Sequence, residues 1–531
     1  MMRYVFCVLV FLLLHQHYGF TQEEYGGYLR YVESSFPRTF DPITAIDDAV
    51  NDRLSAMMFE SLFRLDIHRE IRKELAESYS ISENNRSITV TLKNGAHWSN
   101  AEPVTARDVE RTIEAIRRSE NMNERRMIQH IREVQVQDRR TITFHFTREL
   151  PENVMLRMLT FKILHAHQIN NLPLTVQSEV AKNPAVSGYY KISRQGPNVL
   201  SLQANDHYRV RPGGSTGPYI DEITMFIVGD RGTQVEYLQT NQVDLLIEVP
   251  PELLAQLRAD GYQIRPYESL SFQFIAFNFN NPILQSRNVR QAMVYGFGRE
   301  NALDRIYQRQ GDLISGPFPP ASSYYVRDRE TQPFPFDPFK AMELLDEEGY
   351  TQTNSGDIRS NDAGERLEFD IVIPRYEGDD YGRRVIAQFV SDMQRIGIKI
   401  NIVELEFRSW VQRIRFEHDF DLAYVAVAFD EVSNVSPFFY SENNEPGQEN
   451  FISYNNPAVD ELIERLAQTT DHHEMININR RLHRILREDC PYIFLWSLKK
   501  NAAADQRVRN FMTRVTPYSF FDYVNEWYIR E

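Results

Sequence analysis

Three consecutive stretches decide the fold of this chain: "LEFDIVI" (367–373), "RRVIAQFVSDMQRIG" (383–397) and "IKINIVEL" (398–405). The first and third have the residue pattern of strands. The middle stretch is an amphipathic helix that ends at Gly397, the residue type that favours a helix C-terminus. Strand, helix and strand joined by short links require parallel strands, so the sequence predicts an α/β sheet.

A further strand follows in "FDLAYVAVAFDE" (420–431). Every residue from Leu422 to Ala428 is small or aliphatic except Tyr424, as expected for a strand buried on both faces. Ligands of open α/β sheets bind beyond the carboxyl ends of the strands, where Asp430 is expected. A carboxylate at the end of a core strand needs water, a basic side chain or a cation brought by a ligand, and these three alternatives stay open at this point.

Length and charge exclude several classes of protein. A chain of 531 residues is too long for one core and predicts two or three domains. The net charge is −15 and the basic residues form no block. Nucleic acid and anionic membrane surfaces are therefore not expected as partners, because both require a concentrated positive face.

The N-terminus has the pattern of a secretory signal peptide. Arg3 precedes an apolar run from Val5 to Leu14, and polar residues follow up to Thr21. We expect residues 1–21 to be a signal peptide that is cleaved after Thr21. Cys7 lies too early for a lipid-acceptor cysteine, so a lipoprotein is not expected. Removal of the signal would leave Cys490 alone, which excludes an internal disulfide.

Catalytic motifs are missing from the sequence. It contains no GxSxG elbow, no phosphate-binding GxxxxGK loop and no HExxH. "HHEMIN" (472–477) has Asn477 where a zinc protease needs its second histidine. "HAH" (165–167) would place two histidines on one side of a strand, but no third ligand is apparent from the sequence. We therefore expect no catalytic residue, no metal site, no cofactor and no enzymatic activity.

Six motifs, in order along the mature chain, resemble a known family. They include "LKNGAHWSNAEPVTARDV" (92–109), "GYYKISRQGPNVLSLQANDHY" (188–208), "VEYLQTNQVDLL" (235–246) and "AFNFNNPILQSRNVRQAMVYGFGRENALDRIYQRQGDLISGPFPP" (276–320). "FISYNNPAVDELIERL" (451–466) and "EDCPYIFLW" (488–496) complete the set. The chain thus resembles the solute-binding proteins of ABC importers, specifically solute-binding family 5, the oligopeptide and dipeptide binders.

The resemblance implies a periplasmic binding protein fold of type II, with two α/β lobes that close about a hinge and an extra small α+β domain. Lobe I would combine residues 22–60, 185–270 and 491–531. The extra domain would be 61–184, packed on lobe I, and lobe II would be 271–490.

The resemblance also implies a ligand site. The family's pattern "FDmalvGWgaDy" aligns without gaps on residues 420–431 and puts its aspartate, which pairs with the α-amino group of a peptide, on Asp430. Phe429 and Ala428 precede this residue, and Val427 replaces the family's tryptophan. Further residues expected to bind ligand are Trp410, Arg415, Arg375 and Asp47. Surface ion pairs for the two arginines, simple packing for Trp410 and a solvated loop for Asp430 are the alternatives.

The expected function is that of a periplasmic, monomeric protein that captures an oligopeptide-like solute and delivers it to an ABC permease. The same fold binding a metal chelate, haem, glutathione or an oligosaccharide is one alternative. A secreted hydrolase and a receptor-like interaction protein are the others.

Overall fold

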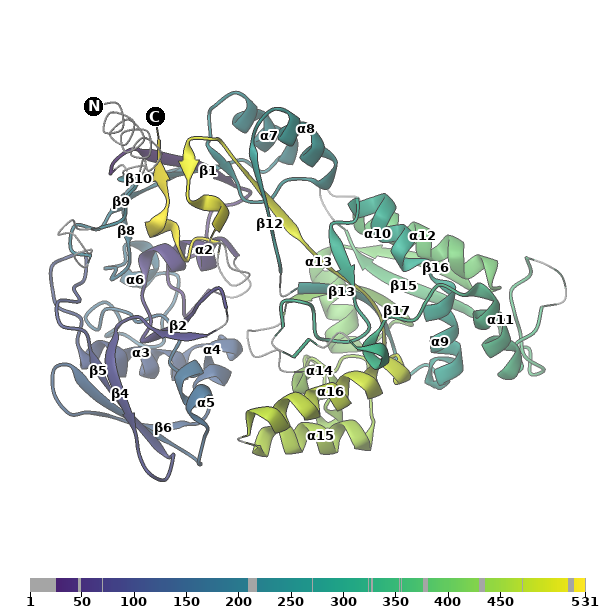
Figure 1. Ribbon diagram of the computed structural model, residues 1–531. Coiled ribbons are helices and arrows are strands. Elements are labelled where there is room, and N and C mark those ends of the chain that lie inside the picture. The colour runs from purple at the N-terminus through teal and green to yellow at the C-terminus, as the bar shows by residue number, and fades with distance from the viewer. Residues whose placement is uncertain are drawn as a thin grey trace, which may run out of the picture.

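The computed structural model describes residues 25–45, 49–68, 70–208, 217–269, 271–322, 324–325, 328–352, 354, 356–375, 381–428, 435–469, 471–513 and 520–530. The described chain forms two large lobes, joined by strands that run from one to the other (Figure 1). The lobe with the N-terminal strands lies at the left of Figure 1, and the lobe with the green helices lies at the right.

The first lobe contains a seven-stranded sheet of strand order β12-β19-β11-β1-β10-β9-β8. Strand β1 pairs in parallel with β10 and β11, and the other pairs are antiparallel. The strands are β1 Tyr28–Glu33, β8 Tyr190–Gly196, β9 Val199–Ala204, β10 Glu222–Ile227, β11 Leu245–Leu246, β12 Gln263–Tyr267 and β19 Lys500–Ala504.

The second lobe contains a six-stranded sheet of strand order β14-β18-β13-β17-β15-β16. Strand β15 pairs in parallel with both β16 and β17, whereas β13 is antiparallel to β17 and β18. The strands are β13 Ser271–Phe277, β14 Gly311–Leu313, β15 Glu368–Pro374, β16 Lys399–Leu405, β17 Leu422–Ala428 and β18 Tyr492–Leu498.

A four-stranded antiparallel sheet of order β4-β5-β7-β6 stands beside the first lobe. Its strands are β4 Ala76–Ile81, β5 Ser87–Leu92, β6 Ile131–Val136 and β7 Thr141–Phe146. Two small antiparallel strand pairs complete the strands: β2 Phe63–Leu65 with β3 Ile71–Lys73, and β20 Val508–Arg509 with β21 Tyr528–Ile529.

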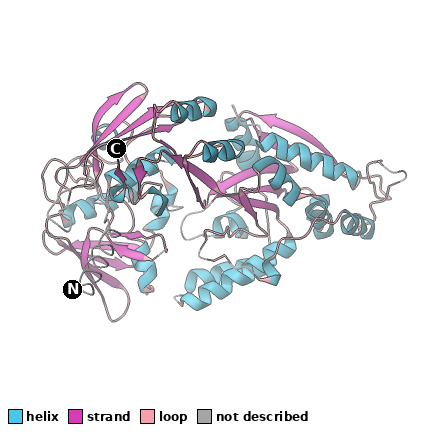
Figure 2. Ribbon diagram, turned by 45° about the horizontal axis from the view of Figure 1, so that its top comes forward, coloured by secondary structure: helices cyan, strands magenta, loops and turns pink. Residues whose placement is uncertain are grey.

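Helices cover the sheets, as the cyan ribbons of Figure 2 show. On the N-terminal side they are α2 Ala49–Met58, α3 Ala106–Arg118, α4 Met122–Met127, α5 Glu152–Arg157, α6 Glu179–Lys182, α7 Arg231–Gln239 and α8 Leu254–Ala259. In the second lobe they are α9 Arg287–Gly296, α10 Arg299–Tyr307, α11 Pro338–Glu347, α12 Tyr381–Arg395, α13 Phe407–Val411, α14 Ser436–Phe439, α15 Pro457–Gln468 and α16 His472–Asp489.

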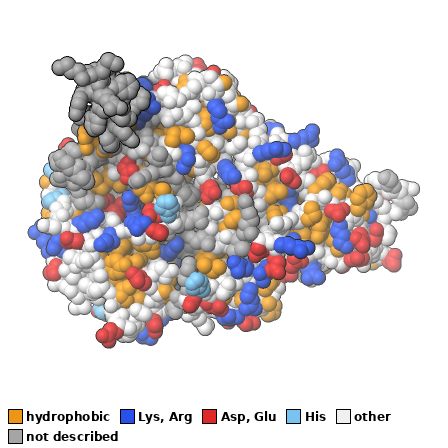
Figure 3. Space-filling model, in the orientation of Figure 1, with side chains coloured by type: hydrophobic (Ala, Val, Ile, Leu, Met, Phe, Trp, Pro, Cys, Tyr) orange, Lys and Arg blue, Asp and Glu red, His pale blue; other side chains and the backbone are white. Residues whose placement is uncertain are grey.

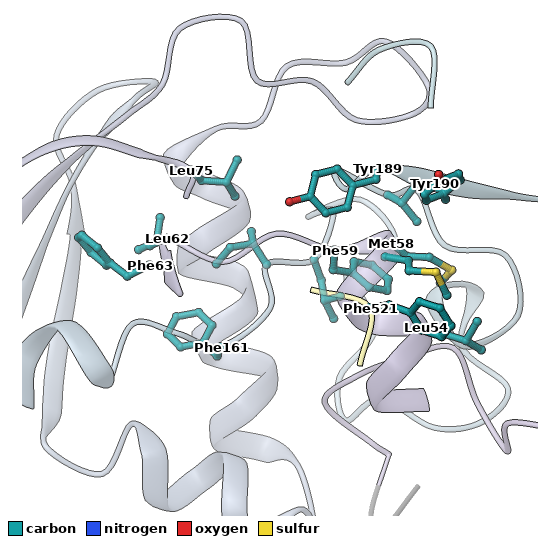
Figure 4. Packing of buried hydrophobic residues seen from close by; sticks show 14 of the residues in the cluster. Leu54, Met58, Phe59, Leu62, Phe63, Leu75, Phe161, Tyr189, Tyr190 and Phe521 are labelled. Carbon is teal, nitrogen blue, oxygen red and sulfur yellow. The ribbon is translucent and has the colours of Figure 1, made fainter. Parts of the chain in front are cut away.

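Each face of the six-stranded sheet has its own core. Alternate residues of a strand point to opposite faces, so Ile275 of β13 packs with α9 to α12 and Phe274 packs with α13 to α16. A third core joins the first sheet to the four-stranded sheet. Figure 4 shows this core around Leu54 and Met58 of α2, with Phe161 and Phe521 brought in from distant parts of the chain.

The predicted α/β fold is confirmed, and the strands and helix expected from residues 367–405 are β15, α12 and β16. One expectation is wrong: residues 165–167 lie in an irregular segment and a turn, not in a strand. The backbone there bonds to helix α3 instead of a neighbouring strand, since Ala166 N donates to Asp108 Oδ1 at 2.8 Å. The domain boundaries stay a prediction.

The chain passes between the two large sheets at a pair of antiparallel strands. Strand β12 of the first sheet leads into β13 of the second, and β18 of the second leads into β19 of the first. Side chains bind the two crossings together, because Ser497 Oγ donates to Ser271 O at 2.9 Å. Two adjacent strands resist shear but permit bending, so this pair is the candidate hinge.

Gln273 organises the second-lobe side of this hinge. Its side-chain oxygen accepts hydrogen bonds from Trp496 Nε1 and from Tyr424 Oη, both at 2.8 Å. Trp496 is fully buried. The amide of Gln273 therefore ties β13 to the strand on each side of it.

We predict that Gln273→Met lowers the free energy of unfolding by about 1–3 kcal/mol, because the buried indole N–H of Trp496 loses its acceptor. Urea unfolding followed by tryptophan fluorescence measures this change. Gln285→Met is the matched control, since Gln285 donates one exposed hydrogen bond to Phe279 O. Equal losses in the two variants would contradict the role of Gln273.

His483 on α16 makes stability depend on pH. Its side chain is buried, and its Nε2 lies 2.9 Å from Ser315 Oγ. Burial lowers the pKa of His483 from 6.5 to about 4; Asp328 opposes this shift and Arg487 adds to it. The folded state thus keeps the imidazole neutral at pH values where the unfolded chain protonates it.

Below pH 6.5 the unfolded state binds a proton that the folded state refuses, so stability is lost as pH falls toward 4. We expect His483 to contribute a loss of about 2 kcal/mol between pH 7.5 and pH 5. Denaturant titrations at both pH values should show this loss in the wild type and in the exposed control His97→Gln, but not in His483→Gln. An unchanged difference in His483→Gln would show that other groups cause the loss.

Candidate functional site

The carboxyl ends of the parallel strands in the second lobe face the hinge. Strands β15, β16 and β17 run in one direction and end at Pro374, Leu405 and Ala428. Ala428 pairs with Ser271, the first residue of β13 after the crossing. The sheet edge at which open α/β folds bind ligands therefore lies beside the hinge, on the side of the first lobe.

Four predicted site residues belong to the last positions of β17 or directly follow it in the sequence. Val427 is half-buried, packs on the core that includes Trp410, and pairs with Phe272. Ala428 ends the strand. Phe429 and Asp430 directly follow Ala428 in sequence but lie outside the described residues, and so does Asp47.

Arg375 stands at the same edge, one residue after β15. Its backbone N donates to Leu405 O at 2.7 Å, which holds the ends of β15 and β16 together. The side chain is 65% exposed, and its Nε lies 3.8 Å from Glu404 Oε1. Arg383 binds that same oxygen more closely, at 2.7 Å. The guanidinium of Arg375 is thus loosely paired and open to solvent.

Trp410 packs inside the second lobe. Its side chain is buried, and its Nε1 lies 3.4 Å from Val372 O of β15. The exposed ring of Phe407 stacks on it with a centroid separation of 5.7 Å. Trp410 therefore joins α13 to the sheet, which is the packing role that the sequence left as an alternative.

Arg415 is not brought to this edge. Its guanidinium binds Glu449 Oε1 at 2.6 Å, and its backbone O accepts from Gly447 N at 2.7 Å. This loop leads to Ile452, whose O accepts from Phe279 N beyond the far end of β13. Arg415 thus fixes a loop at the end of the sheet opposite to Ser271.

The first lobe places charged residues on its own side of the hinge, and the sequence reasoning missed them. Glu33 is buried at the carboxyl end of β1 and forms a two-pronged ion pair with Arg53 of α2, at 2.6 and 2.7 Å. Burial raises the pKa of Glu33, and Arg53 acts against that rise. Lys500, the first residue of β19, binds Glu248 at 3.2 Å. The sequence feature that could have identified Glu33 is its position as an acidic residue at the end of a mostly apolar strand.

Side-chain contacts span the lobes beside the hinge, among them the hydrogen bond from Asn501 Nδ2 to Gln310 Oε1 at 3.0 Å. Tyr381 Oη at the start of α12 donates to Glu252 Oε2 at 2.5 Å, and Glu252 lies in the 3-10 turn Pro251–Leu253 that leads into α8. On the face seen in Figure 3, basic and acidic side chains are mixed over both lobes.

Within the described residues, no helix has the length and apolarity needed to cross a membrane.

Comparisons with known proteins agree with this architecture. The family model described as "Bacterial extracellular solute-binding proteins, family 5 Middle" matches residues 70–449. Among curated proteins, the oligopeptide-binding protein AppA of Bacillus subtilis (strain 168) is 22% identical over 493 residues, which are 92% of this chain and 89% of the relative.

Two solved structures share the fold. AppA from Bacillus subtilis in complex with a nonapeptide has a TM-score of 0.78 at 21% identity and covers 96% of this chain and 100% of its own. NikA from Brucella suis in complex with Fe(III)-EDTA has a TM-score of 0.82 at 20% identity and covers 95% and 100%. The matched family model covers most of the described chain, both lobes included, and the chain therefore belongs to family 5 of the bacterial extracellular solute-binding proteins.

Proposed function

We propose that this protein captures an oligopeptide-like solute between its two lobes and delivers it to an ABC permease. One observation carries the proposal: the last residue of β17 pairs with the first residue of β13, so the chain enters the segment that holds Asp430 at the hinge between the lobes. The curated relative and the solved structure that are named as oligopeptide-binding support a peptide as the ligand.

Asp430 is proposed to bind the α-amino group of the peptide. Ala428, the last residue of β17, pairs with Ser271, the first residue of β13 after the crossing, so the chain leaves β17 toward Asp430 beside the hinge. A charge-assisted hydrogen bond in a cleft that has expelled water is among the stronger polar contacts available to a protein. Val427, in place of the family's tryptophan, is proposed to leave more room for the side chains of the ligand.

Closure of the lobes around the solute is proposed as the mechanism, with no bond broken. A ligand shifts a hinge equilibrium only by its preference for the closed state. Asp430 and Arg375 on the second lobe would grip the peptide, while the first lobe supplies the opposing wall at Glu33 and Arg53. The division into residues 22–60, 185–270 and 491–531, 61–184, and 271–490 is part of this proposal, as are a monomeric state and export to the periplasm.

The amine anchor predicts a loss of affinity in Asp430→Ala. We expect peptide binding to weaken about 10- to 100-fold, the value of one charge-assisted hydrogen bond. Native mass spectrometry of the mature protein, purified without refolding, identifies the released ligands, and isothermal titration calorimetry with one of those peptides gives the dissociation constants. Asp419→Ala is the control, because Asp419 is exposed and pairs with Arg413.

A set of short peptides released from the wild type, and depleted in Asp430→Ala, is the expected result. A single non-peptide mass would overturn the peptide assignment and keep the binding-protein family. Peptides that bind Asp430→Ala with unchanged affinity would overturn the amine anchor alone.

Arg375 is proposed to bind the carboxylate of the peptide. Its loose contact with Glu404 leaves the guanidinium available, and guanidinium groups match carboxylates in a two-pronged geometry. We expect Arg375→Ala to weaken binding of a free-acid peptide about tenfold and to leave binding of the same peptide with an amidated C-terminus unchanged. Arg383→Ala is the control, and equal losses for the acid and the amide would contradict the proposal.

A further inference from the structure

A carboxylate and two imidazoles converge outside the site described above. Glu102, His165 and His167 each offer one ligand atom, and these atoms lie within 4.8 Å of one another. Glu102 Oε2 is 2.8 Å from His165 Nε2 and 3.7 Å from His167 Nδ1. We call these three side chains the Glu102 cluster. It unites the two histidines of the "HAH" motif with the third ligand that the sequence did not reveal.

The backbone of both contributing segments is fixed. Glu102 lies in a tight hairpin in which His97 and Pro103 form an antiparallel bridge, and Trp98 N donates to Glu102 O at 2.7 Å. The turn with both histidines is held to helix α3, because Asp108 accepts from Ala166 N and Thr112 Oγ1 accepts from Leu164 N at 3.0 Å. The side chains are therefore brought together by a folded framework.

The imidazoles are also oriented by their neighbours. His165 is buried and packs edge-on against Trp98, with ring centroids 5.2 Å apart. The ring of His167 meets that of His165 at 79° and a centroid separation of 5.3 Å. Side-chain exposure rises from 7% at His165 to 49% at Glu102 and 75% at His167. The imidazole of His165 is thus fixed inside the protein, whereas the side chains of Glu102 and His167 are open to solvent.

The spacing suits a small divalent ion. Tetrahedral ligands at about 2.1 Å from a metal stand about 3.4 Å apart, and the two distances from Glu102 Oε2 lie on either side of that value. A displacement of about half an ångström at each contact would exchange the hydrogen bond between Glu102 and His165 for two metal bonds. Solvent at the exposed side would supply the fourth ligand.

We propose that Glu102, His165 and His167 form a binding site for a divalent transition-metal ion, with Zn²⁺ as the representative ion. Two imidazoles and one carboxylate favour Zn²⁺, Ni²⁺ and Cu²⁺ over Mg²⁺ and Ca²⁺, which take oxygen ligands. The bound ion joins the hairpin around Glu102 to the turn after β7 and α5 and stabilises the folded chain by linkage. The site is independent of the peptide site proposed at the hinge.

The test is a Zn²⁺ titration of the mature, untagged wild-type protein. Metal is first removed on an immobilised chelating resin, so that no soluble chelate enters the ligand site. Isothermal titration calorimetry should show one Zn²⁺ per chain, and thermal unfolding should shift to higher temperature on Zn²⁺ addition. Titration with Co²⁺ adds a visible absorption spectrum that reports the ligand field of nitrogen and oxygen donors.

Glu102→Gln and His167→Ala remove ligands at exposed positions, so both variants should keep the wild-type fold, checked by near-ultraviolet circular dichroism. We expect each to lose at least tenfold in Zn²⁺ affinity and to lose the thermal shift. His97→Ala is the matched control, since His97 is an exposed histidine of the same hairpin whose Nδ1 lies 2.8 Å from Gly95 O. Asp430→Ala should bind Zn²⁺ as the wild type does.

The proposal is overturned if the wild type binds no stoichiometric Zn²⁺ at micromolar concentration. It is also overturned if Glu102→Gln and His167→Ala bind Zn²⁺ as tightly as the wild type, because the metal would then be held elsewhere.

Discussion

The pairing of two strands across the hinge is the constraint on which the rest of the structure depends. Strands β12 and β19 belong to the first sheet, and their continuations β13 and β18 belong to the second. Tyr267 pairs with Lys500 on one side, and Gln273 with Trp496 on the other. Because both sheets share this pair, a register fixed at the hinge fixes which end of each sheet faces the other lobe. The carboxyl ends of β15, β16 and β17 lie on that side for this reason.

Glu33 ends β1 and Asp430 follows β17 in the sequence, and the roles assigned to these two acids differ. Glu33 ends β1 and is neutralised from within by Arg53, at the cost of burying both charges. Asp430 comes two residues after Ala428, the last residue of β17, and lies outside the described residues. The role proposed for Asp430 is different, since its cation would come with the ligand.

The sequence predicts the second lobe well where the signal is local. Strand β15, helix α12 and strand β16 follow directly from hydrophobic periodicity and from Gly397, whose φ of +83° is the left-handed conformation that glycine adopts at a helix end. The family resemblance adds a division into lobes, which stays a prediction. Contacts between residues far apart in the sequence produce no local pattern. For example, no residue near Arg415 in the sequence indicates that its guanidinium forms an ion pair with Glu449. Likewise, the sequence does not show that the side chain of Trp410, which was expected to contact ligand, is buried in the core of the second lobe.

The Glu102 cluster is a second case in which contacts between distant segments could not be predicted from the local sequence. Two histidines at i and i+2 predict one side of a strand, yet Asp108 and Thr112 hold these residues in a turn against helix α3. The turn directs both imidazoles toward a hairpin 63 residues earlier in the chain. Helix α3 can do this because its own first turn is fixed by Asp108, which also accepts from Thr105 N at 2.7 Å. One capping carboxylate thus sets both the start of a helix and the meeting of three potential metal ligands. The second role depends on contacts between segments far apart in the sequence, which a local residue pattern does not reveal.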